Sequence, residues 1–127
     1  MKQVITAPAA EVAERKTSAI QTVFFKSDSL SLTLYDNGEV DGDTVSILLG
    51  GKIIFSKQGL SEKPVTKTIY TKDIPDSTTL IWYAENLGSI PPNTGLLILY
   101  DGETRHEIFF SADLHTNASL ILSRKKN

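Results

Sequence analysis

The sequence predicts an all-β domain, an antiparallel sandwich of two sheets with about eight to nine strands. From Ile20 onward, short β-branched and aromatic runs are separated by turn residues at intervals typical of all-β domains. No helical periodicity of useful length competes with them. A single flat sheet of this many strands would leave both of its faces in water. Two packed sheets are therefore favoured. A closed β-barrel is the alternative, because alternation alone does not decide whether a sheet closes.

The individual strands follow from local patterns. Leu30, Leu32 and Leu34 alternate with polar residues, which predicts one buried face, and 45–49 repeats the pattern. Gly50-Gly51 suits a tight reversal with positive φ, so 52–57 is the returning strand of a hairpin. The full set of predicted strands is 21–25, 30–35, 45–49, 52–57, 65–71, 79–84, 95–100, 105–110 and 118–123.

The chain has the length and composition of one globular domain. Residues 1–19 include an Ala- and charge-rich stretch unlike the rest, and we expect a tether or peripheral segment there. The sandwich is expected to span 20–123, and 124–127 reads as a basic tail.

Composition excludes several functional classes. The 13 basic and 15 acidic residues give a net charge of −2, which disfavours nucleic acid as a partner. The absence of cysteine excludes disulfides, thiolate catalysis and cysteine-based metal sites. No apolar run is long enough to span a membrane. Ser111, Asp113 and His115 supply the residue types of a hydrolase triad, but no nucleophile elbow accompanies them, so we expect no enzymatic activity.

The connections sort into two groups if successive strands run antiparallel. One end then receives the short turns 50–51, 72–77 and 101–104, and the other receives 36–43, 58–64, 86–94 and 111–117. The second group is longer and richer in carboxylate and amide side chains. Because binding groups commonly sit on loops held by a rigid scaffold, this end is the predicted site of function.

The segment 36–43 is the most acidic of these connections. Its carboxylates and amide are hard oxygen ligands of the kind that calcium prefers. The spacing begins like an EF-hand loop but places Leu48 where the twelfth-position Glu belongs. Turn chemistry, with side chains bonding their own backbone, explains the same residues. The candidate calcium ligands are Asp36, Asn37, Glu39, Asp41 and Asp43.

Candidate ligand-binding residues come from the neighbouring connections. Pro91 and Pro92 stiffen their segment, which could display a ligand-binding ridge or simply cross between the sheets. Alternation predicts that one of Trp82 and Tyr83 is buried and the other outward. Trp82, Tyr83, Tyr35 and Tyr100 are candidates for stacking on sugars. The predicted ligand-binding set is Tyr83, Glu85, Asn86, Asn93 and Asp113.

Three stretches together resemble a known group of proteins: YDNGEVDGDTVS at 35–46, YAENLGSIPPNT at 83–94 and SADL at 111–114. They are similar to stretches of uncharacterised secreted or lipid-anchored β-sandwich proteins of Bacteroidetes-type bacteria. The resemblance covers residues 20–123 and implies a secreted, periplasmic or cell-surface location. It implies no particular activity, and because this sequence contains no lipobox cysteine, the resemblance leaves a lipid anchor open.

These observations lead to two expectations of function. The first is a non-enzymatic binding module of the bacterial envelope that binds carbohydrate, either with calcium or without it, and has its ligand groups on the acidic loop end. The expectation of carbohydrate binding rests on analogy with other β-sandwich proteins. The second is a structural module that packs on a larger surface protein, with purely structural acidic loops. A sugar binder should show an exposed aromatic platform, whereas an interaction module should show an apolar patch or an unprotected edge strand.

Overall fold

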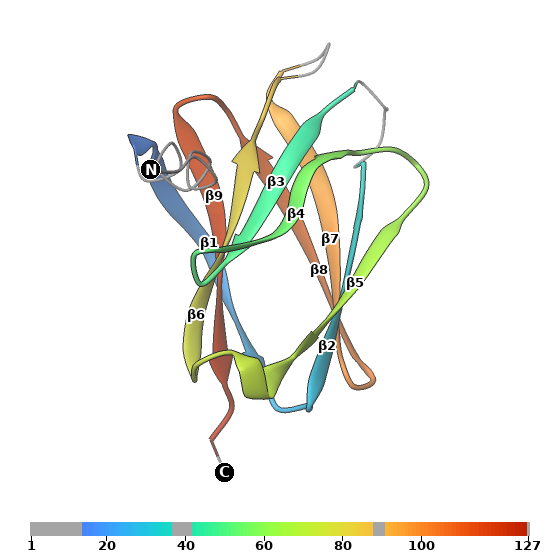
Figure 1. The fold of residues 1–127 in the computed structure, drawn as a ribbon, viewed down its shortest axis with the longest axis vertical. Coiled ribbons are helices and arrows are strands. Elements are labelled where there is room, and N and C mark those ends of the chain that lie inside the picture. The colour runs from blue at the N-terminus through green and yellow to red at the C-terminus, as the bar shows by residue number, and fades with distance from the viewer. Residues whose placement is uncertain (1–13, 37–41, 88–90, 127) are drawn as a thin grey trace, which may run out of the picture.

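The structure is a computed structural model that describes residues 14–36, 42–87 and 91–126. It confirms the two-sheet β-sandwich, and the described strands form two open sheets rather than a closed barrel (Figure 1). One sheet has five strands in the order β1-β9-β6-β3-β4, and the other has four in the order β5-β2-β7-β8. The strands are β1 Lys16–Phe25, β2 Ser29–Tyr35, β3 Thr44–Leu49, β4 Lys52–Gly59, β5 Val65–Tyr70, β6 Ser77–Ala84, β7 Asn93–Asp101, β8 Thr104–Ala112 and β9 Thr116–Arg124.

Every predicted strand has its counterpart among these nine. Most bounds differ by one or two residues, so that Asn93 begins β7 instead of lying in a loop, and the largest difference is at the start of the first strand. β1 begins at Lys16, so residues 16–19 belong to the sandwich and not to a tether. β9 ends at Arg124, so the basic tail is one residue shorter than predicted. A short 3-10 helix, η2 at Thr71–Asp73, lies between β5 and β6.

Successive strands run in opposite directions, as the loop-sorting argument assumed. Among the described strands, β3–β4 and β7–β8 are hairpins of paired neighbours, and each of the other connections crosses from one sheet to the other. Gly50 and Gly51 form the β3–β4 turn with φ of 58° and 87°, which confirms the need for positive φ. β1 and β9 are parallel, since each is an odd-numbered strand of the alternating series.

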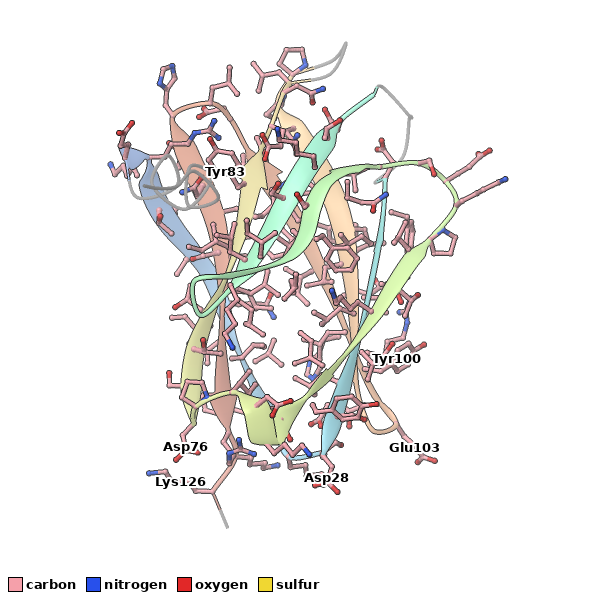
Figure 2. All side chains as sticks on the ribbon, in the orientation of Figure 1. Asp28, Asp76, Tyr83, Tyr100, Glu103 and Lys126 are labelled. Carbon is pink, nitrogen blue, oxygen red and sulfur yellow. The ribbon has the colours of Figure 1, made fainter. Side chains whose placement is uncertain are left out.

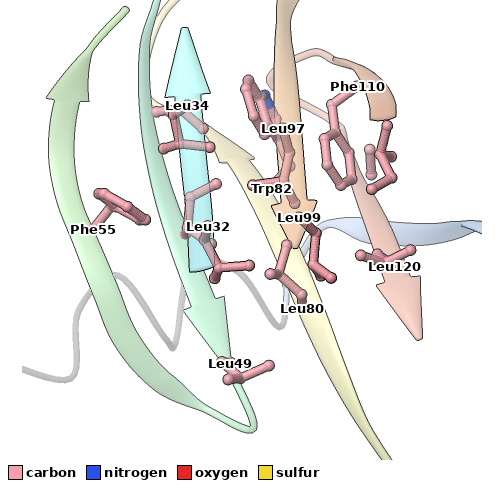
Figure 3. Packing of buried hydrophobic residues seen from close by; sticks show 14 of the residues in the cluster. Leu32, Leu34, Leu49, Phe55, Leu80, Trp82, Leu97, Leu99, Phe110 and Leu120 are labelled. Carbon is pink, nitrogen blue, oxygen red and sulfur yellow. The ribbon is translucent and has the colours of Figure 1, made fainter. Parts of the chain in front are cut away.

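The core lies between the two sheets and is filled by the inward-facing leucines, phenylalanines and the tryptophan (Figure 3). The Trp82 and Phe110 rings stack across it, with centroids 4.8 Å apart. Gly95 lies directly beneath the indole, where a Cβ would come within 2.2 Å of Trp82 Cη2. The glycine is therefore required by the close approach of β7 to the tryptophan.

The connections gather at two ends of the sandwich, as predicted (Figure 1). We call one the loop end, which comprises the described residues of the connections 36–43, 58–64, 85–94 and 111–117. We call the other the turn end, which comprises residues 26–28, 71–76 and 101–104. Gly50 lies beside the start of β6, where its N–H donates to the Thr79 carbonyl, and so belongs to the half nearer the turn end.

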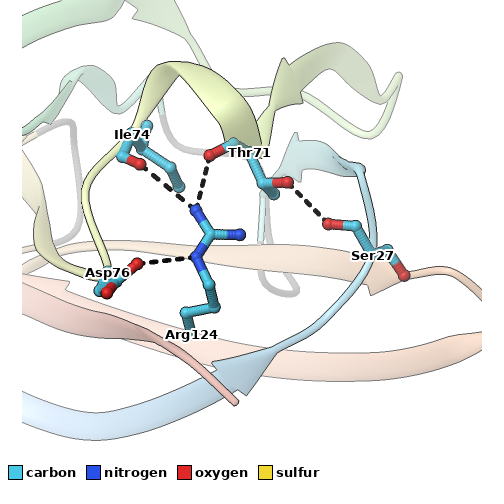
Figure 4. Close-up of polar contacts among 5 residues, drawn as sticks. All are labelled: Ser27, Thr71, Ile74, Asp76 and Arg124. Atoms are coloured by element: carbon cyan, nitrogen blue, oxygen red, sulfur yellow. Dashed lines mark hydrogen bonds and ion pairs between the residues drawn. The ribbon is translucent and has the colours of Figure 1, made fainter. Parts of the chain in front are cut away.

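The turn end is held together by two polar side chains. Arg124 donates from Nε to Asp76 Oδ1 at 2.9 Å and from Nη2 to the Thr71 carbonyl at 2.8 Å (Figure 4). Its guanidinium also lies over the Phe25 ring. Buried Asp101 accepts the backbone N–H groups of Lys26 and Ser27. The last residue of β9, predicted to lie in a solvated tail, thus anchors the η2 turn.

Candidate functional site

Asn93 lies at the centre of the loop end and is completely buried. Its Oδ1 accepts the Trp82 Nε1–H at 2.9 Å, and its Nδ2 donates to the carbonyls of Thr44 and Asn86, also at 2.9 Å. One amide therefore satisfies the only polar atom of the core tryptophan and joins three separate segments. Every polar atom of this predicted ligand-binding residue is used inside the protein.

Glu85 and Asn86 extend the same network. Asn86 Oδ1 accepts the Thr44 N–H at 2.9 Å and its Nδ2 donates to the Gly42 carbonyl. Glu85 Oε2 accepts the Ser46 hydroxyl at 2.6 Å, and that hydroxyl oxygen accepts the N–H of Lys57. These bonds fix the entry into β3 against the exit from β6. The predicted binding residues are brought together, and the bonds that bring them together are internal ones.

The acidic segment is described only at its two ends. Asn37, Glu39 and Asp41 lie outside the described residues. Asp36 and Asp43 are both buried, and Asp43 Oδ2 accepts the Thr94 N–H at 3.0 Å. The backbones of both aspartates bond the 60–61 segment, through Asp36 N–H to Ser61 and Leu60 N–H to Asp43. Within the described ranges, no three His, Asp or Glu residues cluster in a way that could hold a metal ion.

Trp82 and Tyr83 lie on opposite faces of β6, as alternation predicted, with Trp82 in the core and Tyr83 facing outward. Its ring points away from the core on the face opposite Trp82, yet it is only 2% exposed. Arg15 explains part of this burial, because its guanidinium lies 3.8 Å above the ring centre and donates to the carbonyls of Ala84 and Asp113. Glu14, Arg15, Tyr83, Leu114 and His115 line a polar hollow of about 400 Å³ here.

Asp113 acts locally in its turn. Its Oδ1 accepts the N–H groups of His115 at 2.7 Å and Thr116 at 2.8 Å. These two bonds favour the ionised carboxylate and hold the pKa of Asp113 below its ordinary value. Ser111 lies on β8 and pairs with Thr94 on the outer side of the four-stranded sheet. Asp113 is thus a turn-forming carboxylate.

A second hollow lies on the outer face of the four-stranded sheet and was not predicted from the sequence. It has a volume of about 320 Å³, and Ile98 of β7 lies between the two tyrosines that the sequence marked as potential sugar platforms. Tyr35 is half-buried and Tyr100 is 40% exposed, projecting from the side of the sheet (Figure 2). Its lining residues are Thr33, Tyr35, Glu62, Pro64, Ile98, Tyr100 and Arg105.

Charged groups stand on either side of this sheet-face hollow. Arg105, directly opposite Tyr100 in the β7–β8 register, forms an ion pair with Glu107, and this raises the pKa of the guanidinium. Glu62 approaches from the β4–β5 connection. The hollow thus combines aromatic rings, an apolar floor and hydrogen-bonding groups of both charges.

Two signals in the sequence point to this face. The run Leu96-Leu97-Ile98-Leu99 is apolar at every position, whereas a strand with one wet face alternates. In the structure Leu96 and Ile98 face outward and are nonetheless buried by their neighbours. Tyr35 and Tyr100 supply the second signal, because both fall on the polar side of their strands.

No family model, curated protein or solved structure matched this chain. Among the described residues, none of the helices has the length and apolar character needed to cross a membrane.

Proposed function

We propose that this protein is a non-enzymatic binding module of the bacterial cell envelope that binds carbohydrate in the hollow between Tyr35 and Tyr100. The sheet-face hollow carries the proposal. Its volume of about 320 Å³ lies in the range of ordinary ligand pockets, about 300–1,000 Å³. The envelope location rests on the resemblance of the three sequence stretches to secreted proteins.

The chemistry of the hollow suits a sugar. A sugar ring has apolar C–H faces and a rim of hydroxyl groups, and tyrosine offers an apolar face with a polar tip. Ile98 supplies an apolar floor, while Thr33, Glu62 and Arg105 supply acceptors and donors for hydroxyl groups. The binding groups lie on three strands and one connection of a rigid sheet, which favours a preformed site.

The loop end has a structural role in this proposal. Glu85, Asn86, Asn93 and Asp43 each accept or donate hydrogen bonds that join separate connections. A ligand could use those atoms only by displacing bonds that hold the fold. We therefore assign Asp43, through its carboxylate, and Asp36, through its burial and its backbone bond to Ser61, to the fold rather than to calcium.

The test is titration with a panel of soluble neutral polysaccharides, followed by calorimetry and affinity electrophoresis. We expect at least one to bind, and Tyr100→Ala to weaken that binding at least tenfold by removing one ring. Tyr70→Ala is the matched control, because Tyr70 is a 57% exposed tyrosine on the same four-stranded sheet but outside the hollow. Equal effects of the two substitutions, or no binding across the panel, would contradict the proposal.

The alternative function is a module that interacts with other polypeptide chains. A specific observation favours it, namely that the edge strand β1 is exposed along most of its length. This edge is independent of the sheet-face hollow, since none of its residues lines that hollow.

A further inference from the structure

β1 is the least protected of the four edge strands. Eight of its ten residues are exposed, namely Lys16 to Thr22 and Phe24, and in the described part of the chain β9 is its only strand partner. Between Lys16 and Lys26 the sequence TSAIQTVFF has no charge, proline or glycine. Exposed edges of this kind are templates for pairing with another strand, and native proteins normally protect them against such pairing.

The other three edges carry recognised protective devices. β4 has two register irregularities against β3, together with Lys57 at a positive φ of 45°. β5 places Lys67 on its inward-facing side, between positions that pack on the core. β8 carries Arg105 and Glu107 on its outer side. An inward-pointing lysine, charges and bulges all disfavour edge-to-edge pairing.

The open part of β1 is Gln21–Phe25, which follows a bulge at residues 19–21 and keeps a regular register with β9. The Phe25 carbonyl accepts the Lys125 N–H at 2.7 Å, so Phe25 turns its backbone groups toward β9. Because the two directions alternate along a strand, Thr22 and Phe24 present their N–H and C=O groups to the open side. Phe24 also exposes 58% of its surface on the outer face.

We infer that two copies of this chain pair through β1, antiparallel about a two-fold axis centred on Val23. This register places Thr22 opposite Phe24 of the second copy, a β-branched and aromatic pair that covers the exposed ring. Lys26 then lies opposite Ile20, so no charged side chain faces another of the same sign. Self-pairing of β5 would instead bring two inward-pointing lysines into one short interface.

The paired copies form one continuous ten-stranded sheet, with both hollows of the four-stranded sheets left open. The contact is short compared with stable interfaces, which bury about 1,200–2,000 Å². We therefore expect a weak, concentration-dependent dimer, with a dissociation constant in the micromolar range or above.

Sedimentation equilibrium over a concentration series tests the inference with the full chain. We expect a mass that rises from 13.9 kDa toward twice that value. Phe24→Lys should raise the dissociation constant at least tenfold without lowering the unfolding midpoint, because the residue is exposed. Thr22→Lys is a second variant of the same edge. The matched control is Phe109→Lys on β8, which replaces a phenylalanine of similar exposure, 54%, on the other sheet.

Amide hydrogen exchange gives an independent readout of the register. The amides of Thr22 and Phe24 should exchange more slowly as the concentration rises, while that of Val23, which faces β9, should not change. A chain that stays monomeric at millimolar concentration would overturn the inference. So would a dimer that Phe109→Lys disrupts and Phe24→Lys does not, since that result places the contact on the four-stranded sheet. Neither outcome affects sugar binding, which is measured through Tyr100.

Discussion

The loop end and the turn end of the sandwich look different in sequence and are built alike in structure. The loop end has long connections with many carboxylates and amides, and the turn end has short ones. Each end nevertheless has a buried polar side chain at its centre, Asn93 in one and Asp101 in the other. Asn93 bonds the Asn86 carbonyl of its own connection and the Thr44 carbonyl at the start of β3, and Asp101 bonds the backbone of the β1–β2 connection.

The comparison teaches that many polar side chains at one end of a sandwich can serve to hold the connections in place rather than to bind a ligand. Chains that cross between sheets leave backbone groups without ladder partners, and buried backbone groups must be paired. Asn86 and Asp43 meet that need at the loop end, as Arg124 does at the turn end. On the outer sheet face around Tyr100, by contrast, Thr33 and Arg105 bond other exposed side chains rather than the backbone of a connection.

The largest expected effect tests Asn93. Asn93→Leu keeps the branching at Cγ but leaves the buried Trp82 Nε1–H without its acceptor and the Asn86 carbonyl without the amide donor, while the Thr44 carbonyl still accepts the Glu85 N–H. We expect the free energy of unfolding to fall by about 3–4 kcal/mol, since each unsatisfied buried group costs about 1–3 kcal/mol. Urea denaturation measures it. Asn86→Ala is the control, because water can replace the bonds of this exposed amide, and equal losses in the two variants would refute the central role of Asn93.

A smaller effect is expected at the turn end. Burial raises the pKa of Asp101, but hydrogen bonds from Ser27 and Lys26 outweigh it, and the pKa lies below its ordinary value of 3.8. The ionised form is thus favoured by folding, and the stabilisation is present above pH 3.8 and is lost as the pH falls through the folded pKa. Asp101→Asn should cost about 2 kcal/mol at pH 7, in line with hydrogen bonds to charged groups.

The pH dependence separates this role from a general loss of charge. The difference in unfolding free energy between the natural chain and Asp101→Asn should shrink as the pH falls below about 4. Asp28→Asn, at an exposed aspartate of the same turn, should show no such difference at any pH. A constant difference for Asp101→Asn down to pH 2 would contradict an ionised carboxylate as its source.

The smallest expected effect concerns calcium at the loop end. If the carboxylates of Asp36 and Asp43 belong to the internal network, millimolar calcium added after chelation should leave the thermal unfolding midpoint within about 1 °C. A ligand that binds only the folded state would raise it by several degrees at a hundredfold excess over its dissociation constant. A rise of that size, abolished by Asp36→Asn, would instead establish a calcium site.

The strands were predictable from the sequence because their signal is local. Leu30, Leu32 and Leu34 alternate with polar residues, and Gly50-Gly51 marks the reversal, so period and turn chemistry suffice. The start of β1 was not predictable in this way. Its first seven residues are exposed, so burial imposes no alternation on them, and only pairing with β9 makes them a strand.

The candidate site was predictable only in part, for a similar reason. Sequence spacing brought Glu85, Asn86 and Asn93 to one end, but it could not tell whether their oxygens face a ligand or a neighbouring backbone. The sheet-face hollow depends on the β2–β7–β8 register, which sets residues distant in sequence side by side. Arg15 over Tyr83 is likewise a contact between segments far apart in the chain.

The parallel pairing of β1 with β9 determines how this domain would respond to mechanical load. β1 starts at the loop end and β9 finishes at the turn end, so a force applied to both strands at those points pulls them in opposite directions along their length (Figure 1). The ladder between them is then loaded in shear, and its hydrogen bonds must break together rather than one after another. Forced unfolding is governed by the barrier to such a step. The sandwich would therefore transmit tension along its long axis before it opened.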